Sequence, residues 1–415
     1  MAGWAYFDCA NSAYSLVIAI AIFPVYFAKL FADGEMVRFF GMQIAPSALL
    51  AYAVTIAYSI VTILSPLLSG IADYGGKRKL FQQLFTLLGA VACISMFWLT
   101  AAANWHIGFW AYVVATVGYA GGVVFNNSYM PVIATPDMYD RLSAKGFMYG
   151  YIGSVFLLLL NLIMILKFDW FGFESAAMPS RISFVMVGVW WLGFSQMARV
   201  RLPADSQVPL QRKAIALGWA EYLAVFRQVR KNSNLKNYLT AYFCYDAGVQ
   251  TVLFMATVFA NEVLHFGAAE LIILVLILQL VGALGAWVFS KIAETRGSLI
   301  VITWMLVAWA VICLLAYLVQ SKAGFYALGV GVGAVMGGIQ SLSRSTYSKL
   351  VPNDNSSTSY FSFFDITDKI AVVLGTFAFG FINQITGDIR YSALTMVVFF
   401  VLGLFFIRPV RLAAD

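Results

Sequence analysis

The stretch LIILVLILQLVGALGAWVFSKIAETRG, residues 271–297, opens with an apolar run from Leu271 to Phe289 that only Gln279 interrupts. A helix that crosses the hydrocarbon core of a membrane needs about 20 predominantly apolar residues. The run has about this length, and charge first returns at Lys291. It therefore predicts a membrane-spanning helix that ends at a charged turn.

The composition extends this prediction to the whole chain. Of its 415 residues, 62% are hydrophobic and 11% are charged, with a mean hydropathy of +0.84. A soluble domain carries about 25% charged residues, so a soluble fold is excluded. An outer-membrane barrel is excluded as well, because its strands alternate apolar and polar residues, whereas apolar runs such as 393–407 are nearly continuous. The fold class is therefore an all-α membrane protein.

Twelve apolar segments are long enough to cross the membrane. They lie at about 4–31, 46–72, 81–103, 108–134, 144–166, 181–199, 237–261, 268–292, 298–320, 323–348, 358–384 and 389–407. The first segment lacks a basic start and carries Asp8, so we expect a membrane helix and not a cleaved signal peptide. The cysteines lie in apolar segments and the histidines in short connections, which predicts no disulfide framework, no metal site and no cofactor.

Lysine and arginine residues predict the orientation of the chain. With both termini cytoplasmic, 18 of the 26 basic residues fall on cytoplasmic connections, span edges and the tail, 6 fall on the outer side, and Arg344 and Lys369 lie inside spans. We therefore expect a multi-pass protein of a bacterial cytoplasmic membrane with cytoplasmic termini. Basic loops that face anionic lipid headgroups then explain the net charge of +7 without nucleic acid.

An internal repeat divides the chain in two. Residues 69–76 (SGIADYGG) match residues 290–297 (SKIAETRG) in serine, isoleucine, alanine, acid and glycine at an offset of 221. Two weaker echoes occur in the same order, Gly121-Gly122 before Pro136 against Gly337-Gly338 before Pro352, and Phe7-Asp8 against Tyr245-Asp246. Parallel repeats of this kind are a transporter architecture.

The repeat predicts twelve transmembrane helices in two pseudo-symmetric six-helix bundles. We place the bundles at 1–199 and 237–415, joined by a cytoplasmic linker at 200–236. The linker contains an amphipathic segment with Ile215, Trp219, Tyr222, Phe226 and Val229 at helical spacing and basic residues around them. This pattern is typical of a helix that lies in the membrane interface.

The repeated turn has a physical logic. Gly76 permits a tight reversal, Arg78 and its basic neighbours hold the loop at the headgroups, and Asp73 can pair with a basic residue or a helix N-terminus. We interpret the turn as fixing the topology, with a latch between the two halves as a further hypothesis. The candidate conformational residues are Asp73, Gly76, Arg78, Glu294 and Arg296.

At these residues the chain resembles the major facilitator superfamily, whose signature after the second span reads Gly-x-Leu-Ala-Asp-Arg-x-Gly-Arg-Arg/Lys. Residues 69–78 read SGIADYGGKR, so Ser69 replaces the first glycine and Tyr74 replaces the arginine. Further stretches resemble the UMF group, which includes the fungal autophagy-related vacuolar amino-acid effluxers. They are 4–14 (WAYFDCANSAY), 23–27 (FPVYF), 126–131 (NNSYMP), 140–146 (DRLSAKG) and 337–345 (GGIQSLSRS). The resemblance implies a transporter of amino acids or related small solutes.

Polar residues inside spans are the candidate site. A charge there costs ~2.5–3.5 kcal/mol on the insertion scale, so each needs a partner, a cavity or a function. At a rise of ~1.5 Å per residue, Asp246 lies roughly 14 Å and Asp365 roughly 11 Å inside their spans, where transporter sites are expected. The candidate substrate- and ion-binding residues are Asp8, Asn11, Asn126, Asp246, Gln250, Gln340, Arg344 and Asp365.

Each charged candidate has a structural alternative. Asp365 can pair with Lys369 one turn later, Arg344 can snorkel to the interface, and Asp8 can stabilise a helix N-terminus. Asp246 has no basic neighbour at helical spacing, and low-dielectric surroundings disfavour the charged form of a carboxyl group. Asp246 is therefore the strongest candidate for a proton carrier. Interhelical hydrogen bonds are expected from Asn126, Asn127, Asn161 and Asn383.

These observations favour a secondary transporter that moves a small polar solute, an amino acid or related carboxylate-bearing molecule, by alternating access. Proton coupling is a further hypothesis, and Arg344 is a candidate to grip the carboxylate of the solute. The expected partners are the solute, protons and membrane lipids, with a monomeric chain. Two alternatives stay open, a non-coupled facilitator and an intramembrane lipid-modifying enzyme. The enzyme would need an acidic cluster at a membrane face, where Asp137 and Asp140 are better interpreted as interface charges.

Overall fold

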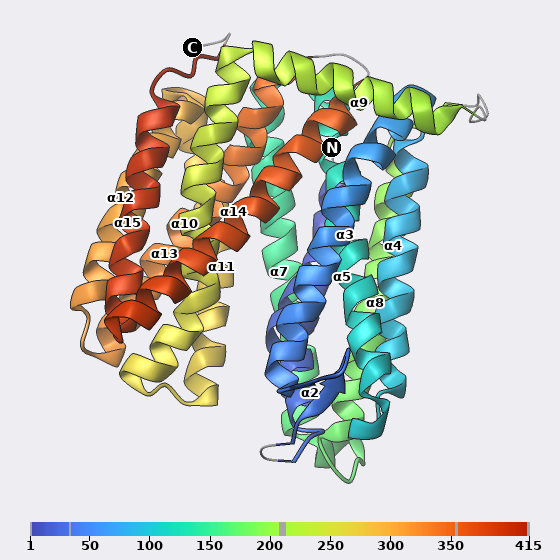
Figure 1. Ribbon diagram of the computed structural model, residues 1–415, viewed down its shortest axis with the longest axis vertical. Coiled ribbons are helices and arrows are strands. Elements are labelled where there is room, and N and C mark those ends of the chain that lie inside the picture. The colour runs from blue at the N-terminus through green and yellow to red at the C-terminus, as the bar shows by residue number, and fades with distance from the viewer. Residues whose placement is uncertain (1, 33–34, 207–212, 353–355, 413–415) are drawn as a thin grey trace. The chain divides into compact units, whose positions relative to one another are not determined.

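The protein is almost entirely helical in the computed structural model (Figure 1). The structure describes residues 2–32, 35–206, 213–352 and 356–412. The strands within these ranges form one antiparallel hairpin, in which Val37 pairs with Ile44. The apolar runs form helices because, where no water is present, a helix satisfies its backbone polar groups internally.

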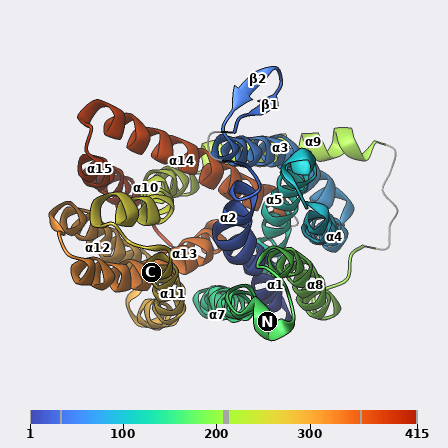
Figure 2. The ribbon, with the colours of Figure 1, turned by 90° about the horizontal axis from the view of Figure 1, so that it is seen from below.

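The first half of the chain forms six long helical segments within the described residues. The first consists of α1 (Ala2–Ala13), the π-helical η1 (Tyr14–Ile22) and α2 (Phe23–Ala28), and the others are α3 (Pro46–Gly75), α4 (Arg78–Ser95), α5 (Trp105–Asn127), α7 (Tyr139–Leu166) and α8 (Ala177–Arg201). The hairpin of β1 (Val37–Phe39) and β2 (Met42–Ile44) projects to one side of α3 (Figure 2). The remaining short elements are η2 (Met96–Trp98), η3 (Ala102–Asn104), α6 (Met130–Ile133), η4 (Pro136–Met138) and η5 (Phe168–Phe171).

The second half begins with a short amphipathic helix and continues with six long ones. These helices are α9 (Ala214–Lys231), α10 (Ser233–Leu264), α11 (Ala268–Arg296), α12 (Ser298–Leu318), α13 (Lys322–Leu350), α14 (Ser357–Thr386) and α15 (Ile389–Ile407). The predicted amphipathic segment of the linker is therefore a helix, α9.

The long helices account for the twelve spans that the sequence predicts. Eleven helices among the described residues are long and apolar enough to cross a membrane. Helix α14, with 30 residues, occupies the predicted eleventh span and carries Asp365, Asp368 and Lys369. Together these helices correspond to the twelve predicted segments, with ends that differ by a few residues.

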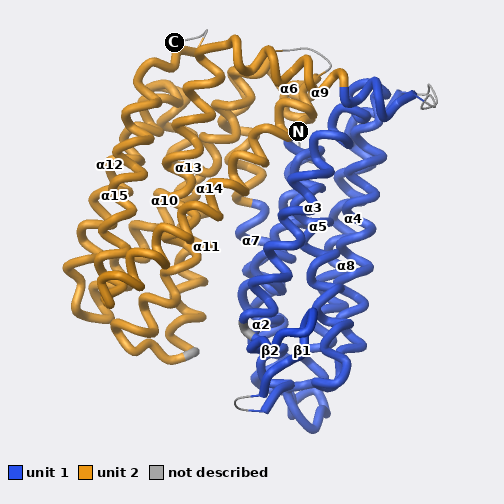
Figure 3. The backbone as a smooth tube through the Cα atoms, in the orientation of Figure 1, with its two compact units in different colours: residues 1–127, 149–219 blue, residues 128–148, 220–415 orange. Residues whose placement is uncertain are grey.

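Two compact units make up the chain (Figure 3). Unit 1 contains residues 1–127 and 149–219, and unit 2 contains residues 128–148 and 220–415. The segment 128–148, which covers the end of the fourth predicted span and the start of the fifth, therefore packs with the second half of the chain. The repeat-based domains 1–199, 200–236 and 237–415 remain a prediction about the symmetry of the sequence.

Helices α10 and α14 of unit 2 approach each other closely beside the candidate residues. A Cβ atom at Gly375 of α14 would come within 2.3 Å of the Ala247 carbonyl oxygen and of the Thr251 hydroxyl of α10. Only glycine fits there, as is common where membrane helices meet. This contact brings α14 against the turn of α10 that carries Asp246.

Candidate functional site

Three carboxyl groups and one ammonium group gather between α10 and α14 in unit 2. Lys369 Nζ lies 3.0 Å from Asp365 Oδ1 and 2.7 Å from Asp368 Oδ2. The predicted pairing of Asp365 with Lys369, one helical turn apart, is therefore present. Asp246 completes the group from α10, and its carboxyl interacts with that of Asp368. We call Asp246, Asp365, Asp368 and Lys369 the acid cluster.

Neutral side chains of α10 hold the acid cluster together. Gln250 Nε2 lies 3.4 Å from Asp246 Oδ1 and 3.3 Å from Asp368 Oδ1, so one amide bridges the two helices. The Tyr242 hydroxyl donates to Asp368 Oδ1 at 3.4 Å. Gln250 is thus at the candidate site, as the sequence predicts.

Asp246 has no basic neighbour at helical spacing along α10, as the sequence predicts, but charged groups of another helix act on it. Lys369 and Asp368 both act on its carboxyl from α14. The search at helical spacing missed them because it compares residues along one helix, and the partners of Asp246 lie on another. Asp368, which lies in the same predicted span as Asp365 and Lys369, also belongs to the site.

Burial makes the charge balance of the acid cluster important. Asp246 and Asp365 are 4% and 5% exposed, and Lys369 is 8% exposed. Removing charges from water is costly unless they are paired. One lysine balances one of the three carboxylates, so the fully ionised cluster has an excess of negative charge that a proton or a cationic group can neutralise.

A second polar group lies in unit 1, where α1, α4 and α5 meet. Asn126 is fully buried, and its backbone carbonyl accepts a hydrogen bond of 2.7 Å from Trp4 Nε1. Its side-chain oxygen accepts from Gln82 Nε2 at 2.9 Å, so its Nδ2 is directed to Asp8 Oδ1 at 3.4 Å. Asp8 therefore has an amide partner across the helices and is half-buried.

The predicted interhelical asparagines have different outcomes. Asn126 confirms the prediction through Gln82 and Asp8. Asn11, which the sequence predicts as a binding residue, also donates between helices, from its Nδ2 to the Tyr119 carbonyl of α5 at 3.4 Å. For Asn161 the prediction is wrong, because its amide oxygen and nitrogen are buried without a hydrogen-bond partner among the described residues.

Arg344 of α13 is buried inside unit 2 and contacts the start of α7. Its Nε and Nη2 donate to the hydroxyl and the backbone carbonyl of Ser143, each at 3.0 Å, and its guanidinium lies 4.3 Å from the Phe147 ring centre. At 5% exposure it does not snorkel to the interface, so that alternative is wrong. Gln340, one turn earlier on α13, is half-buried.

Asp140 is also buried, which corrects its interpretation as an interface charge. Its carboxylate accepts hydrogen bonds from Ser345 at 2.6 Å and Ser298 at 2.9 Å, and it pairs with Lys349 at 2.7 Å. The sequence shows these residues far apart, and only the packing of 128–148 with the second half brings them together. Asp137, three residues earlier, is exposed.

We expect Asp140→Asn to lower the free energy of unfolding by about 1–3 kcal/mol, because Lys349 and two serine hydroxyls lose their charged acceptor. Thermal unfolding of the purified protein in detergent measures the effect. The matched control is Asp137→Asn, an exposed aspartate whose replacement should change stability by less than about 0.5 kcal/mol. Equal shifts for the two variants would show that the Asp140 network contributes no stability.

The candidate conformational residues lie at two turns, one in each unit. In unit 1, Asp73 pairs with Arg78 at 3.1 Å, and Gly76 between them has φ of +60°, a left-handed conformation that favours glycine. The predicted tight reversal and the basic partner of Asp73 are thus present within the turn itself. Their role as a latch remains a prediction.

The corresponding turn of unit 2 pairs differently. Among the described residues, the ion pairs of Glu294 are with Arg141 at 3.1 Å and Lys291 at 3.6 Å. Arg296, expected beside Glu294, is exposed in the last turn of α11. Arg141 of α7 is therefore the partner of Glu294 that a test of the latch hypothesis at this turn should replace.

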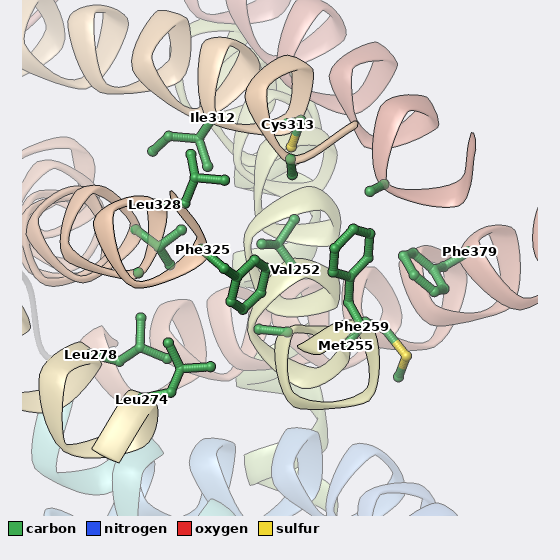
Figure 4. Close-up of a pocket in the computed structure, with 15 residues that line it drawn as sticks. Val252, Met255, Phe259, Leu274, Leu278, Ile312, Cys313, Phe325, Leu328 and Phe379 are labelled. Atoms are coloured by element: carbon green, nitrogen blue, oxygen red, sulfur yellow. The ribbon is translucent and has the colours of Figure 1, made fainter. Parts of the chain in front are cut away.

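An apolar pocket lies within unit 2, and its lining contains no residue of the acid cluster (Figure 4). Side chains of α10 to α15 line this pocket, and they include Phe259, Phe325 and the thiol of Cys313. The lining offers no charged group that would hold a polar solute. The polar solute site is therefore sought at the acid cluster and not in this pocket.

A family model described as vacuole effluxer Atg22 like matches residues 1–413 of the chain. The chain belongs to the Atg22-like effluxer family. An uncharacterized MFS-type transporter of Bacillus subtilis, YxiO, is 28% identical over 404 residues, which cover 97% of this chain and 92% of that relative. Autophagy-related protein 22 of Yarrowia lipolytica is 22% identical over 461 residues, covering 89% and 77% of the two chains.

Solved transporter structures share the fold of this Atg22-like chain. The fucose:proton symporter FucP of E. coli superposes with a TM-score of 0.71 at 14% identity, covering 98% of this chain and 96% of that chain. A bacterial homologue of the iron transporter ferroportin gives a TM-score of 0.69 at 14% identity, covering 98% and 97%. The chain is therefore a multi-pass secondary transporter of the major facilitator superfamily, and the lipid-modifying enzyme is rejected.

Proposed function

We propose that this Atg22-like transporter couples the movement of an amino acid, or a related small solute with an amino group, to the movement of protons by alternating access. We place it, as a monomer, in a bacterial cytoplasmic membrane with both termini in the cytoplasm. The observation that carries the proposal is the acid cluster, whose three carboxyl groups face one lysine inside a membrane-spanning unit.

The charge balance of the acid cluster supports proton coupling. A proton neutralises a buried excess of carboxylates with less structural change than any larger cation. It can bind or leave as the surroundings of the cluster change. The groups that act on Asp246 are Asp368 and Lys369 of α14 and, on its own helix, Gln250, Tyr242 and Tyr245. We assign the exchangeable proton to Asp246, because Asp365 and Asp368 both lie against Lys369.

The same charges support a solute with an amino group. The acid cluster of unit 2 provides carboxylates for an ammonium group. We do not assign the carboxylate of the solute to Arg344, because its Nε and Nη2 already donate to Ser143.

The proposal is tested by proton flux in proteoliposomes. Purified protein is reconstituted with a pH-sensitive dye inside, and each common amino acid is added outside in turn. A substrate is expected to change the internal pH, and an imposed pH gradient is expected to drive accumulation of the labelled form. Protein-free liposomes and a protonophore are the controls.

Two results would contradict the proposal. A labelled amino acid that equilibrates without any change of internal pH would show a non-coupled facilitator. Proton flux with solutes that lack an amino group, and none with amino acids, would show that the solute class is wrong while proton coupling is right.

A further inference from the structure

Helix α9 presents one face to the protein and leaves two faces exposed. At 100° per residue, the buried positions fall within one narrow stripe. They are Ala214, Gly218, Tyr222, Val225 and Val229. The helix is therefore docked along its length and cannot turn without losing these contacts.

The docked face of α9 has specific contacts in each unit. Its first turns belong to unit 1, where a Cβ atom at Gly70 of α3 would come within 2.0 Å of the Gly218 carbonyl oxygen. Its later turns belong to unit 2, where the Tyr222 ring stacks on Phe363 of α14 at 4.7 Å.

Two polar contacts add to this docking on α14. Glu221 accepts a hydrogen bond of 2.5 Å from the Ser356 hydroxyl, and Gln228 accepts one from the Tyr360 hydroxyl. The docking fixes the rotation of α9 about its axis, and so decides which residues it exposes.

The exposed part of α9 combines an apolar stripe with a basic one. Ile215, Trp219 and Phe226 lie on one side of the docked face and are 64%, 46% and 41% exposed. Beyond them around the helix come the exposed cations Arg227, Arg230 and Lys231, and exposed Lys213 directly precedes the first turn.

The only acidic residue of α9 is Glu221, which is engaged with Ser356 on the docked side. The exposed surface of the helix is therefore apolar and basic without an opposing charge of its own. Apolar side chains beside a run of cations complement the surface of an anionic bilayer, in which apolar residues enter the acyl boundary and cations meet headgroups.

We propose that the exposed face of α9 is a binding surface for anionic lipid, and that the bound lipid holds α9 in place on the start of α14. Phe363, on which Tyr222 stacks, lies two residues before Asp365 of the acid cluster. The lipid-bound helix thus contacts the same helix that carries the cluster.

The surface is tested with the whole protein in liposomes, by a fluorophore at Trp219→Cys. The four native cysteines are buried, so the introduced exposed thiol is labelled selectively. We expect brominated phosphatidylglycerol to quench the fluorescence of the label at least about twofold more strongly than brominated phosphatidylcholine does. The triple variant Arg227→Gln, Arg230→Gln, Lys231→Gln should remove this difference between the two lipids.

A matched control removes as many exposed cations outside α9, through Arg199→Gln, Lys236→Gln and Arg408→Gln. It should keep the preference for phosphatidylglycerol, and the thermal unfolding of all variants should be similar. Equal quenching by the two lipids in the parent protein, or equal loss in the two triple variants, would overturn the proposal. If aqueous iodide quenches the label and brominated lipid does not, the proposal is also overturned. The exposed face of α9 would then be a surface for a protein partner.

Discussion

Lys369→Met is expected to destabilise the protein more than any other single change considered, by about 3–5 kcal/mol. The variant leaves Asp246, Asp365 and Asp368 buried together without a cation. Removing one partner of a buried ion pair is strongly destabilising because the other partner stays desolvated and uncompensated. Thermal unfolding in detergent, at a pH near neutrality, measures the loss.

The matched control for this prediction is Lys322→Met. Lys322 also pairs with a carboxylate, Glu270 at 2.7 Å, but that pair is exposed at the start of α11. Exposed pairs contribute little because water screens them, so little change is expected. A double variant, Lys369→Met with Asp368→Asn, should recover part of the lost stability because it removes an unpaired charge as well. Similar unfolding of Lys369→Met and Lys322→Met would show that the acid cluster does not depend on its lysine.

The sequence predicted the spans because the hydrocarbon core imposes a length and an apolar composition that single segments reveal. It also predicted the turn at Gly76 and the pairing of Asp365 with Lys369, which are local along the chain. Both depend on residues within one turn or one helical repeat, and helical geometry alone brings such residues together.

The partners of Asp246 and Asp140 were not predictable in this way. Asp368 reaches Asp246 from another helix, and the register of α10 on α14 depends on close packing at Gly375. Asp140 meets Ser345 and Lys349 because 128–148 packs within unit 2. A pattern that compares residues along one helix has no information on such contacts. The one available signal was the excess of acids over bases on α14.

Asp246→Asn is expected to abolish accumulation driven by a pH gradient. The variant removes one carboxylate and leaves Asp365 and Asp368 with Lys369, so the remaining cluster is closer to charge balance and should stay folded. A cluster with one fewer carboxylate has less excess negative charge and therefore a lower affinity for a proton. One proton moving down one pH unit supplies about 1.4 kcal/mol, which supports about tenfold accumulation of a solute. We expect this ratio to fall to about one.

Counterflow separates the loss of coupling from the loss of transport. Exchange of labelled for unlabelled solute needs no net proton movement, so Asp246→Asn should retain it while the parent and the variant differ in accumulation. Asp169→Asn, at an exposed aspartate of η5, is the control of equal charge change and should behave as the parent does. Full accumulation in Asp246→Asn would assign the proton elsewhere, and Asp368→Asn then becomes the decisive variant, because its carboxyl faces both Asp246 and Lys369. If both single variants accumulate normally, the acid cluster only stabilises the contact of α10 with α14.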